Sequence, residues 1–223
     1  MNLLLSGRPN SALPATTSTP GPGRSRRVGR LLAAALALGA AAVPAAIVAA
    51  PAAEAATVRV YGDAARDVVQ VPRSGSSSYI PVPAATVPDV RRTAVTLSGS
   101  LLEIRVRFAA PVPTSNFGLT GTIKTPARTY LFERVVAGQR GSYFLSKGRD
   151  GRSRCSGFSI SYVDRLTVAR VRVPARCIGR PSAVRLTLGV SSNVFQPSAR
   201  VDDAFARGFR GDALAVSPRI RRG

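Results

Sequence analysis

Asp63, Asp67 and Asp89 are the residues of this chain whose type and spacing best suit a cation site. Calcium takes six to eight oxygen ligands, and two carboxylates in one short segment with a third nearby supply part of such a set. Arg59 and Arg66 lie close to them in sequence, so the competing interpretation is that these acids cap turns and pair with arginine. We expect that second role and no bound metal, and these three aspartates remain the calcium candidates of the chain.

Two glutamates, Glu103 and Glu133, raise the question of glycoside hydrolysis, which needs two carboxyl groups at a defined separation, one with a raised pKa. Both lie within predicted strands, and the excess of arginine is expected to lower carboxylate pKa values. We therefore expect cross-strand ion pairs instead of catalysis. Asp202, Asp203 and Asp212 form a further acidic group near the C-terminus. The two adjacent acids, Asp202 and Asp203, begin a segment with helical spacing, where acids complement the helix dipole.

No pairing of a nucleophile with a base is visible in the sequence. The chain contains no histidine, which excludes Ser-His and Cys-His pairs and histidine-containing zinc sites. Ser146 and Lys147 are adjacent, so on a strand they would point to opposite faces. Neither an S-x-x-K nor a G-x-S-x-G pattern occurs. The sequence therefore predicts a protein that is not an enzyme and holds no cofactor.

Arginine dominates the charge of the chain. Among 32 basic residues only Lys124 and Lys147 are lysine, a bias that fits a GC-rich genome, and the net charge is +21. The candidate anion-binding residues alternate with apolar residues along predicted strands: Arg105, Arg107, Arg170, Arg172 and Arg185. If these strands share a sheet, one face presents guanidinium groups, which match phosphate and carboxylate groups. The competing interpretation is a solvated face biased by codon usage.

Alternating hydrophobicity from residue 57 onward predicts an all-β fold, a single antiparallel, jelly-roll-like β-sandwich of about nine strands. Strands are expected at 58–61, 90–98, 101–109, 117–125, 128–136, 142–146, 157–163, 166–173 and 183–192. Gly99-Ser100 predicts a tight hairpin between two of them. The alternation changes phase within 166–173, which a bulge near Ala169 or burial on both faces would explain. Helical spacing is confined to 202–209.

The two cysteines, Cys155 and Cys177, bracket the predicted strands 157–163 and 166–173. In an oxidising compartment they are expected to form a disulfide that clamps this hairpin. Such a bridge closes a loop of roughly 22 residues and contributes about 3 kcal/mol in the chain-entropy account. The alternative is two free thiols.

Two short motifs resemble a group of secreted actinobacterial proteins without an assigned activity. They are Asp63-Ala64-Ala65-Arg66-Asp67-Val68 and Arg172-Val173-Pro174-Ala175-Arg176-Cys177-Ile178-Gly179-Arg180-Pro181. The resemblance implies a secreted β-sandwich and no particular chemistry. Arg66 stands where the group has glycine, a substitution expected to disfavour a left-handed turn. This departure weakens any proposal that the loop wraps an ion.

An export signal is expected ahead of this domain. Residues 31–50 are apolar and uncharged, follow several arginines, and precede Ala53-Glu54-Ala55, the pattern of a secretory signal peptide over 31–55. The alternative is a retained anchor, since about 20 apolar residues can span a bilayer. Arg26-Arg27 leaves the twin-arginine route open beside the general secretory route.

Residues 1–30 are rich in Ser, Thr, Pro, Gly and Arg, and we expect a disordered basic region there, or a true translation start at Val28. Residues 1–55 hold five Arg and one Glu, so the domain 56–223 keeps 27 basic and 10 acidic residues and a net charge of +17. The charge therefore belongs to the predicted exported domain.

Together these features predict a non-enzymatic protein that is secreted or associated with the cell envelope. Its expected partner is an anionic polysaccharide or a teichoic-type polymer, bound through the arginine-rich strand faces. Sequence-specific nucleic-acid binding is not expected, because the aromatic residues show no stacking pattern. A membrane is contacted only through an uncleaved leader. The alternatives are a cell-wall polymer hydrolase acting through Asp63 and Asp67, and a structural or partner-binding ectodomain.

Overall fold

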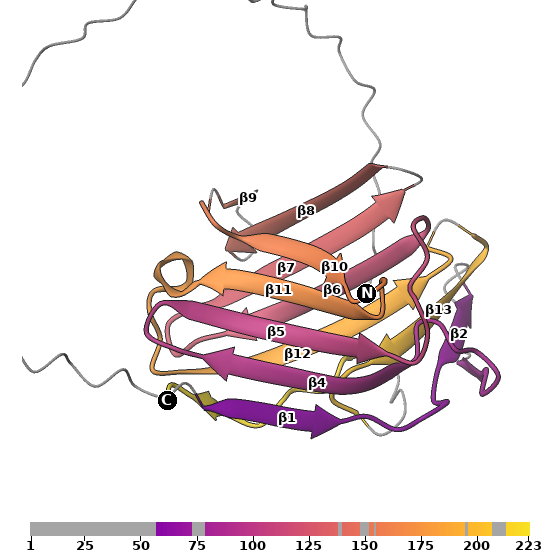
Figure 1. Ribbon diagram of the computed structural model, residues 1–223, viewed down its shortest axis with the longest axis horizontal. Coiled ribbons are helices and arrows are strands. Elements are labelled where there is room, and N and C mark those ends of the chain that lie inside the picture. The colour runs from indigo at the N-terminus through magenta and orange to yellow at the C-terminus, as the bar shows by residue number, and fades with distance from the viewer. Residues whose placement is uncertain are drawn as a thin grey trace, which may run out of the picture. The chain divides into compact units, whose positions relative to one another are not determined.

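The computed structural model describes residues 57–72, 79–137, 140–147, 152–153, 155–194, 196–206 and 213–223. The predicted leader, 1–55, lies outside the described residues. In the described part, two antiparallel sheets pack face to face as a β-sandwich (Figure 1). The all-β sandwich predicted from the alternation is therefore confirmed. No helix of the described part is long and apolar enough to cross a membrane.

The first sheet has five strands and lies nearer to the viewer in Figure 1. Its order is β1 (Val58–Gly62), β4 (Val90–Leu97), β5 (Leu101–Phe108), β11 (Val168–Pro174) and β10 (Ser159–Val163). Strands β4 and β5 form the hairpin predicted at Gly99-Ser100, closed by the Ser98 amide donating to the Leu101 carbonyl at 2.9 Å. Strand β11 then pairs with β5, which brings two distant parts of the chain side by side.

The second sheet has nine strands. Its order is β3 (Ile80–Pro81), β2 (Val69–Pro72), β13 (Ser198–Asp203), β12 (Ala183–Ser192), β6 (Phe117–Lys124), β7 (Thr129–Ala137), β8 (Arg140–Lys147) and β9 (Arg152–Ser153), with β14 (Ile220–Arg221) paired to β12. The central pairing of β6 with β12 runs over eight residue pairs without interruption, so this part of the sheet is a regular platform.

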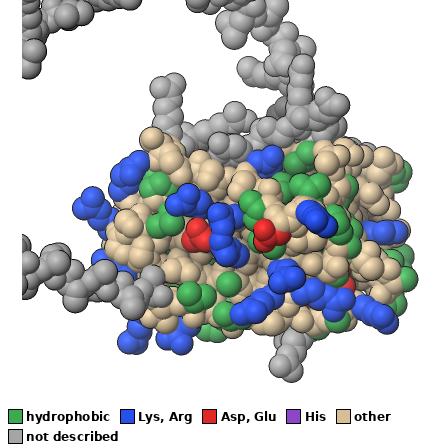
Figure 2. Space-filling model, in the orientation of Figure 1, with side chains coloured by type: hydrophobic (Ala, Val, Ile, Leu, Met, Phe, Trp, Pro, Cys, Tyr) green, Lys and Arg blue, Asp and Glu red, His purple; other side chains and the backbone are tan. Residues whose placement is uncertain are grey.

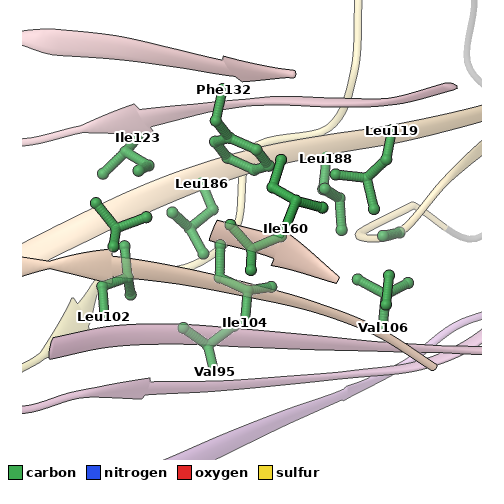
Figure 3. Packing of buried hydrophobic residues seen from close by; sticks show 14 of the residues in the cluster. Val95, Leu102, Ile104, Val106, Leu119, Ile123, Phe132, Ile160, Leu186 and Leu188 are labelled. Atoms are coloured by element: carbon green, nitrogen blue, oxygen red, sulfur yellow. The ribbon is translucent and has the colours of Figure 1, made fainter. Parts of the chain in front are cut away.

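Apolar side chains from the inner faces of both sheets fill the space between them. Figure 3 shows Ile104 and Ile160 of the first sheet directed toward Leu186, Leu188 and Phe132 of the second. All five are at most 2% exposed. Because strand side chains alternate between faces, the positions between these core residues must point outward. The core therefore fixes which residues the outer faces present.

All nine predicted strands are present, with bounds that differ by three residues or fewer at each end. The sequence does not predict β13 or the shorter strands β2, β3, β9 and β14. A bulge near Ala169, one of the two explanations given for the change of phase, is wrong: β11 begins at Val168 and pairs regularly with both neighbours, whereas Leu166 belongs to the preceding turn. The change of phase in the sequence is therefore a strand boundary.

The helix expected over 202–209 is also wrong over its described residues. Asp202 and Asp203 end strand β13, and the chain turns at Ala204. Asp202 is fully buried, so its carboxyl serves the interior and not a helix start. Phe209 and Asp212 lie outside the described residues.

Cys155 and Cys177 form the predicted disulfide, with their Cα atoms 5.8 Å apart. The bridge joins the entry to β10 with the 3-10 helix η1 (Ala175–Ile178), which follows β11. Arg176 strengthens the same closure by donating from Nη2 to the Ser156 carbonyl at 2.6 Å. The β10–β11 hairpin at the edge of the first sheet is thus tied at its open end. A disulfide of this kind indicates an oxidising environment.

Candidate functional site

Four of the five arginines singled out in the sequence lie on the outer face of the five-stranded sheet. Arg105 and Arg107 alternate along β5 with the buried Ile104 and Val106, so both point away from the core. On β11, Arg170 and Arg172 alternate in the same way with buried residues. Because β5 and β11 are neighbours, the two arginine pairs share one surface.

Strand register sets the order of charges on this surface. Arg170 lies opposite Arg105, and Arg172 lies opposite Glu103. On the other side of β5, Arg107 lies opposite Arg92 of β4, a fifth arginine of the face that the sequence analysis did not single out. Neighbouring strands are about 4.8 Å apart and alternate residues on a strand roughly 6.7 Å apart. The five guanidinium groups therefore form a compact lattice.

Glu103 is the acidic residue of this lattice and lies at one end of it, opposite Arg172. Its Oε1 atom lies 2.8 Å from Arg105 Nε and 3.8 Å from Arg170 Nε, and its Oε2 atom lies 3.7 Å from Arg172 Nε. One carboxylate therefore orients three guanidinium groups, as expected for a cross-strand ion pair. With five arginines and one glutamate, the face keeps a net charge of +4.

The arginines of this face are open to solvent. The side chains of Arg105 and Arg172 are 50% and 51% exposed, and that of Arg170 is 30% exposed. Figure 2 shows basic side chains spread across the same view as Figure 1, with few acidic side chains among them. Ala94, Ser159 and Ser161 occupy neighbouring outward positions, and their small side chains leave the guanidinium groups accessible. We call this surface of Arg92, Arg105, Arg107, Arg170, Arg172 and Glu103 the arginine face.

Arg185, the fifth arginine predicted to bind anions, does not belong to the arginine face. It lies on β12 of the other sheet, opposite Lys124 of β6. The idea that all these strands share one sheet is therefore wrong for β12, because the chain crosses between the sheets after η1.

A second polar cluster, of aspartates, forms where the β1–β2 loop meets β13. Asp63 and Asp67 come from that loop and Asp202 from β13, and one carboxylate oxygen of each lies within 4.8 Å of the others. Asp89, at the start of β4, and Asp203 interact electrostatically with this group. The sequence predicts a separate role for Asp202 and Asp203, because nothing local indicates that β13 packs beside the β1–β2 loop.

These carboxyl groups bind backbone amides from several segments. Asp202 accepts from the Val90 amide at 2.6 Å and from the Asp203 amide at 2.8 Å. Asp203 accepts from the amides of Phe205 and Ala215. Asp89 pairs with the Arg91 guanidinium at 3.1 Å. The cluster therefore ties the β1–β2 loop, the start of β4 and the C-terminal region to one another.

Burial, with repulsion from neighbouring carboxylates, raises the pKa values of Asp63, Asp89, Asp202 and Asp203. Burial, followed by the charges of Asp202 and Asp67, raises the pKa of Asp63 to about 9. Burial also raises the pKa of Asp202 to about 7, against the opposing effect of the Val90 amide. The expectation that surplus arginine would lower carboxylate pKa values is wrong here, because desolvation outweighs the charge of nearby arginines.

The cluster could hold a cation only with the oxygens that remain. Both oxygens of Asp202 and of Asp203 already accept backbone amides. Buried Asp63 Oδ2 has no hydrogen-bond partner among the described residues, and Asp67 supplies a further oxygen. Calcium needs six to eight oxygens. The geometry therefore favours a structural role over a cation site: the carboxyl groups share protons and hydrogen-bond to backbone amides of several segments. This role is close to the turn capping expected for Asp63, Asp67 and Asp89.

Arg66 adopts a left-handed conformation, with φ of 66°, between Asp63 and Asp67. The left-handed turn therefore forms although arginine, and not glycine, occupies this position. The left-handed region costs a non-glycine residue roughly 1–2 kcal/mol. The Arg66 amide donates to the carboxylate of Asp89, 3.4 Å from each oxygen, and this contact helps to hold the turn.

Glu103 and Glu133 lie on the outer faces of opposite sheets. Glu133, on β7, is paired in register with the outward-facing Thr120 of β6. Since the two carboxyl groups point away from each other across the core, they cannot act on one glycosidic bond. The predicted cross-strand ion pair is confirmed for Glu103, which pairs with Arg170 and Arg172 of β11, whereas burial raises the pKa of Glu133.

Comparison of the chain with protein-family models, curated proteins and solved structures finds no match.

Proposed function

We propose that this protein is a non-enzymatic binding domain, exported from the cell, whose arginine face holds anionic polymers of the cell envelope or the extracellular space. The observation that carries the proposal is the gathering of five arginines and a single glutamate on one outer sheet face. Guanidinium groups donate paired hydrogen bonds that suit phosphate and carboxylate groups. Teichoic-type polymers and acidic polysaccharides carry such groups at regular intervals.

The arrangement of the lattice supports a polymer ligand. Adjacent arginines, such as Arg105 and Arg170, lie directly opposite each other, and like charges in such positions repel unless a counter-charge screens them. Glu103 supplies one negative charge for three of the five arginines. A polyanion lying across the face would supply the remainder. The disulfide, which indicates an oxidising environment, is consistent with export.

Polymer binding is measured by retention on columns that carry single-stranded DNA, heparin or poly(glycerol phosphate), followed by affinity titration over a range of salt concentrations. We expect retention at about 50 mM salt and a steep salt dependence, because bound cations release counterions. The triple variant Arg105→Gln/Arg107→Gln/Arg172→Gln should reduce the slope of log K against log salt for single-stranded DNA by about two, since each contact contributes about 0.7.

The matched control removes three exposed arginines from turns outside the arginine face, Arg128→Gln/Arg165→Gln/Arg180→Gln. It lowers the net charge by the same amount and should leave most of the slope intact. An equal loss in both triple variants would show that overall charge, and not the arginine face, binds the polymer. Flow-through of the wild type at about 50 mM salt would rule out the proposal altogether.

The aspartate cluster supports a second candidate, a cell-wall polymer hydrolase acting through Asp63 and Asp67. The observation in its favour is a carboxyl group of raised pKa, Asp63, within 4.8 Å of two others. Against it, Asp202 is fully buried and engaged by backbone amides. Wall-polymer turnover that is unchanged in Asp67→Asn would dispose of this candidate. If neither polymer binding nor wall-polymer turnover is found, the remaining candidate is a structural or partner-binding ectodomain.

A further inference from the structure

The basic residues Lys124, Arg185 and Arg219 gather at one end of the nine-stranded sheet, away from the arginine face. Lys124 ends β6, and Arg185 lies directly opposite it on β12. Both alternate with the buried Ile123, Val184 and Leu186, so their side chains point out of the sandwich. Two like charges in directly opposed positions repel and destabilise a sheet.

Arg219 approaches from the other side of β12. The segment that carries it runs beside β12: the Ser217 amide donates to the Leu186 carbonyl, the Leu186 amide donates to Ser217 Oγ, and Ile220 pairs with Val184. The three cations line one hollow of about 260 Å³, together with Thr125, Pro126 and Val184. All three are exposed, and among the described residues none of them is paired with a carboxylate.

We propose that this hollow binds a phosphate group. Three cations with apolar walls and no acidic partner suit a compact dianion, which can accept hydrogen bonds from two guanidinium groups and an ammonium group at once. Phosphate in this position also screens the repulsion between Lys124 and Arg185. The site lies on the opposite sheet from the arginine face, so phosphate binding here can be tested separately from polymer binding there.

Isothermal titration of the folded domain with inorganic phosphate at pH 8, with ionic strength held constant by chloride, tests the proposal. We expect saturable binding that weakens by about tenfold in Arg185→Gln and in Lys124→Gln, the factor for one lost charge-assisted hydrogen bond. Arg165→Gln removes one exposed arginine from a turn of the other sheet and should bind as the wild type does. The triple variant of the arginine face should also retain this binding.

Binding of methyl phosphate and of dimethyl phosphate distinguishes the possible sources of the phosphate group. A monoester keeps two negative charges, so methyl phosphate should bind as inorganic phosphate does, which would fit a polymer end or a free phosphate. Dimethyl phosphate, which models an internal diester, and acetate should bind more weakly. Equal binding of acetate would overturn the assignment to phosphate.

Unfolding in phosphate-free buffer supplies a second readout. Arg185→Gln should be more stable than the wild type there, because it removes the opposed charge, and phosphate should reverse the order. Binding that persists in both single variants would overturn the proposal. So would the absence of saturable binding in the wild type, or an equal loss in Arg165→Gln.

Discussion

Arg105 and Arg170 lie directly opposite each other on β5 and β11, and both guanidinium groups contact the carboxylate of Glu103. Opposed like charges are expected to weaken a sheet, and here one acidic residue offsets part of that cost. Glu103 therefore stabilises the folded arginine face while it reduces the positive charge available to a ligand. The two effects can be separated by removing the carboxylate charge alone.

Glu103→Gln should lower the free energy of unfolding and tighten polymer binding. We expect a loss of about 1 kcal/mol in denaturant unfolding at low salt, the upper end of the range for exposed ion pairs. Binding of single-stranded DNA should tighten by up to about fivefold, since one unit charge at about 4 Å is worth about 1 kcal/mol in water. Both effects should shrink at high salt.

The control for this variant is Glu133→Gln, which makes the same change of charge on the outer face of the opposite sheet. Polymer affinity should not change there. Weaker binding by Glu103→Gln would contradict the expectation. It would mean that Glu103 contributes more by holding Arg105, Arg170 and Arg172 in position than it subtracts by its charge.

Alternation along single strands is enough to predict the sandwich, the nine main strands and the outward direction of all five candidate arginines. The two-residue alternation of apolar side chains determines these features within each strand, because every second residue must face the interior. Strand order is not local. The pairing of β11 with β5, which places Arg170 opposite Arg105, and the position of β12 in the other sheet depend on chain crossings that no short pattern encodes.

The aspartate cluster shows the same limit. Asp63 and Asp67 were identified as a pair, but Asp202 reaches them only because β13 pairs with β2 beside their loop. Burial then reverses the expected direction of the pKa shifts. Arg134 of β7 is another case: its guanidinium carbon lies 5.2 Å from the centroid of the Tyr162 ring of β10, a contact between the two sheets that no pattern within β7 indicates.

The raised pKa of Asp63 predicts that stability falls with rising pH. In the folded protein Asp63 keeps its proton up to about pH 9, whereas the unfolded chain releases it near the ordinary value of 3.8. The stability from this group is therefore full below about pH 4 and is lost as pH rises to about 9. Above pH 7, where Asp202 with its pKa of about 7 has largely ionised, the remaining loss belongs mainly to Asp63.

Asp63→Asn replaces the protonated carboxyl with a neutral side chain of the same shape, and should flatten this dependence. Melting temperatures measured from pH 4 to pH 9 should converge at the acid end. At pH 9 the variant should melt about 2–4 °C higher, the shift produced by about 1 kcal/mol in a domain of this size after allowance for solvent screening. Asp164→Asn, at an exposed turn, should keep the wild-type slope. Parallel curves for wild type and Asp63→Asn would show that Asp63 is ionised at neutral pH.

The Cys155–Cys177 disulfide should account for a substantial part of the stability. Its sequence separation of 22 residues corresponds to about 3 kcal/mol of restricted unfolded-chain entropy. Urea unfolding of the double variant Cys155→Ala/Cys177→Ala should show that loss, and reductant should destabilise the wild type but leave the double variant unchanged. A loss below about 1 kcal/mol would mean that the remaining contacts at this end, including Arg176 to Ser156, already hold the hairpin.

Gly121 is the position in the second sheet where a single methyl group should do most damage. A Cβ atom there would lie 2.4 Å from the Thr187 carbonyl oxygen and 2.4 Å from Cζ of Phe132. The ring could shift within the core, but the carbonyl is fixed by the pairing of β6 with β12. Gly121→Ala should therefore lower the free energy of unfolding by about 3 kcal/mol, at the upper end for overpacking.

Gly99→Ala is the matched control, because a Cβ atom at Gly99 meets nothing within 4 Å. Its unfolding midpoint should stay close to that of the wild type. The double variant Gly121→Ala/Phe132→Leu separates the two contacts: it relieves the clash with the ring but not the one with the carbonyl. If the carbonyl dominates, the double variant should gain nothing over Gly121→Ala, since the smaller side chain also leaves a cavity. Full recovery would show that the ring alone requires glycine at this position.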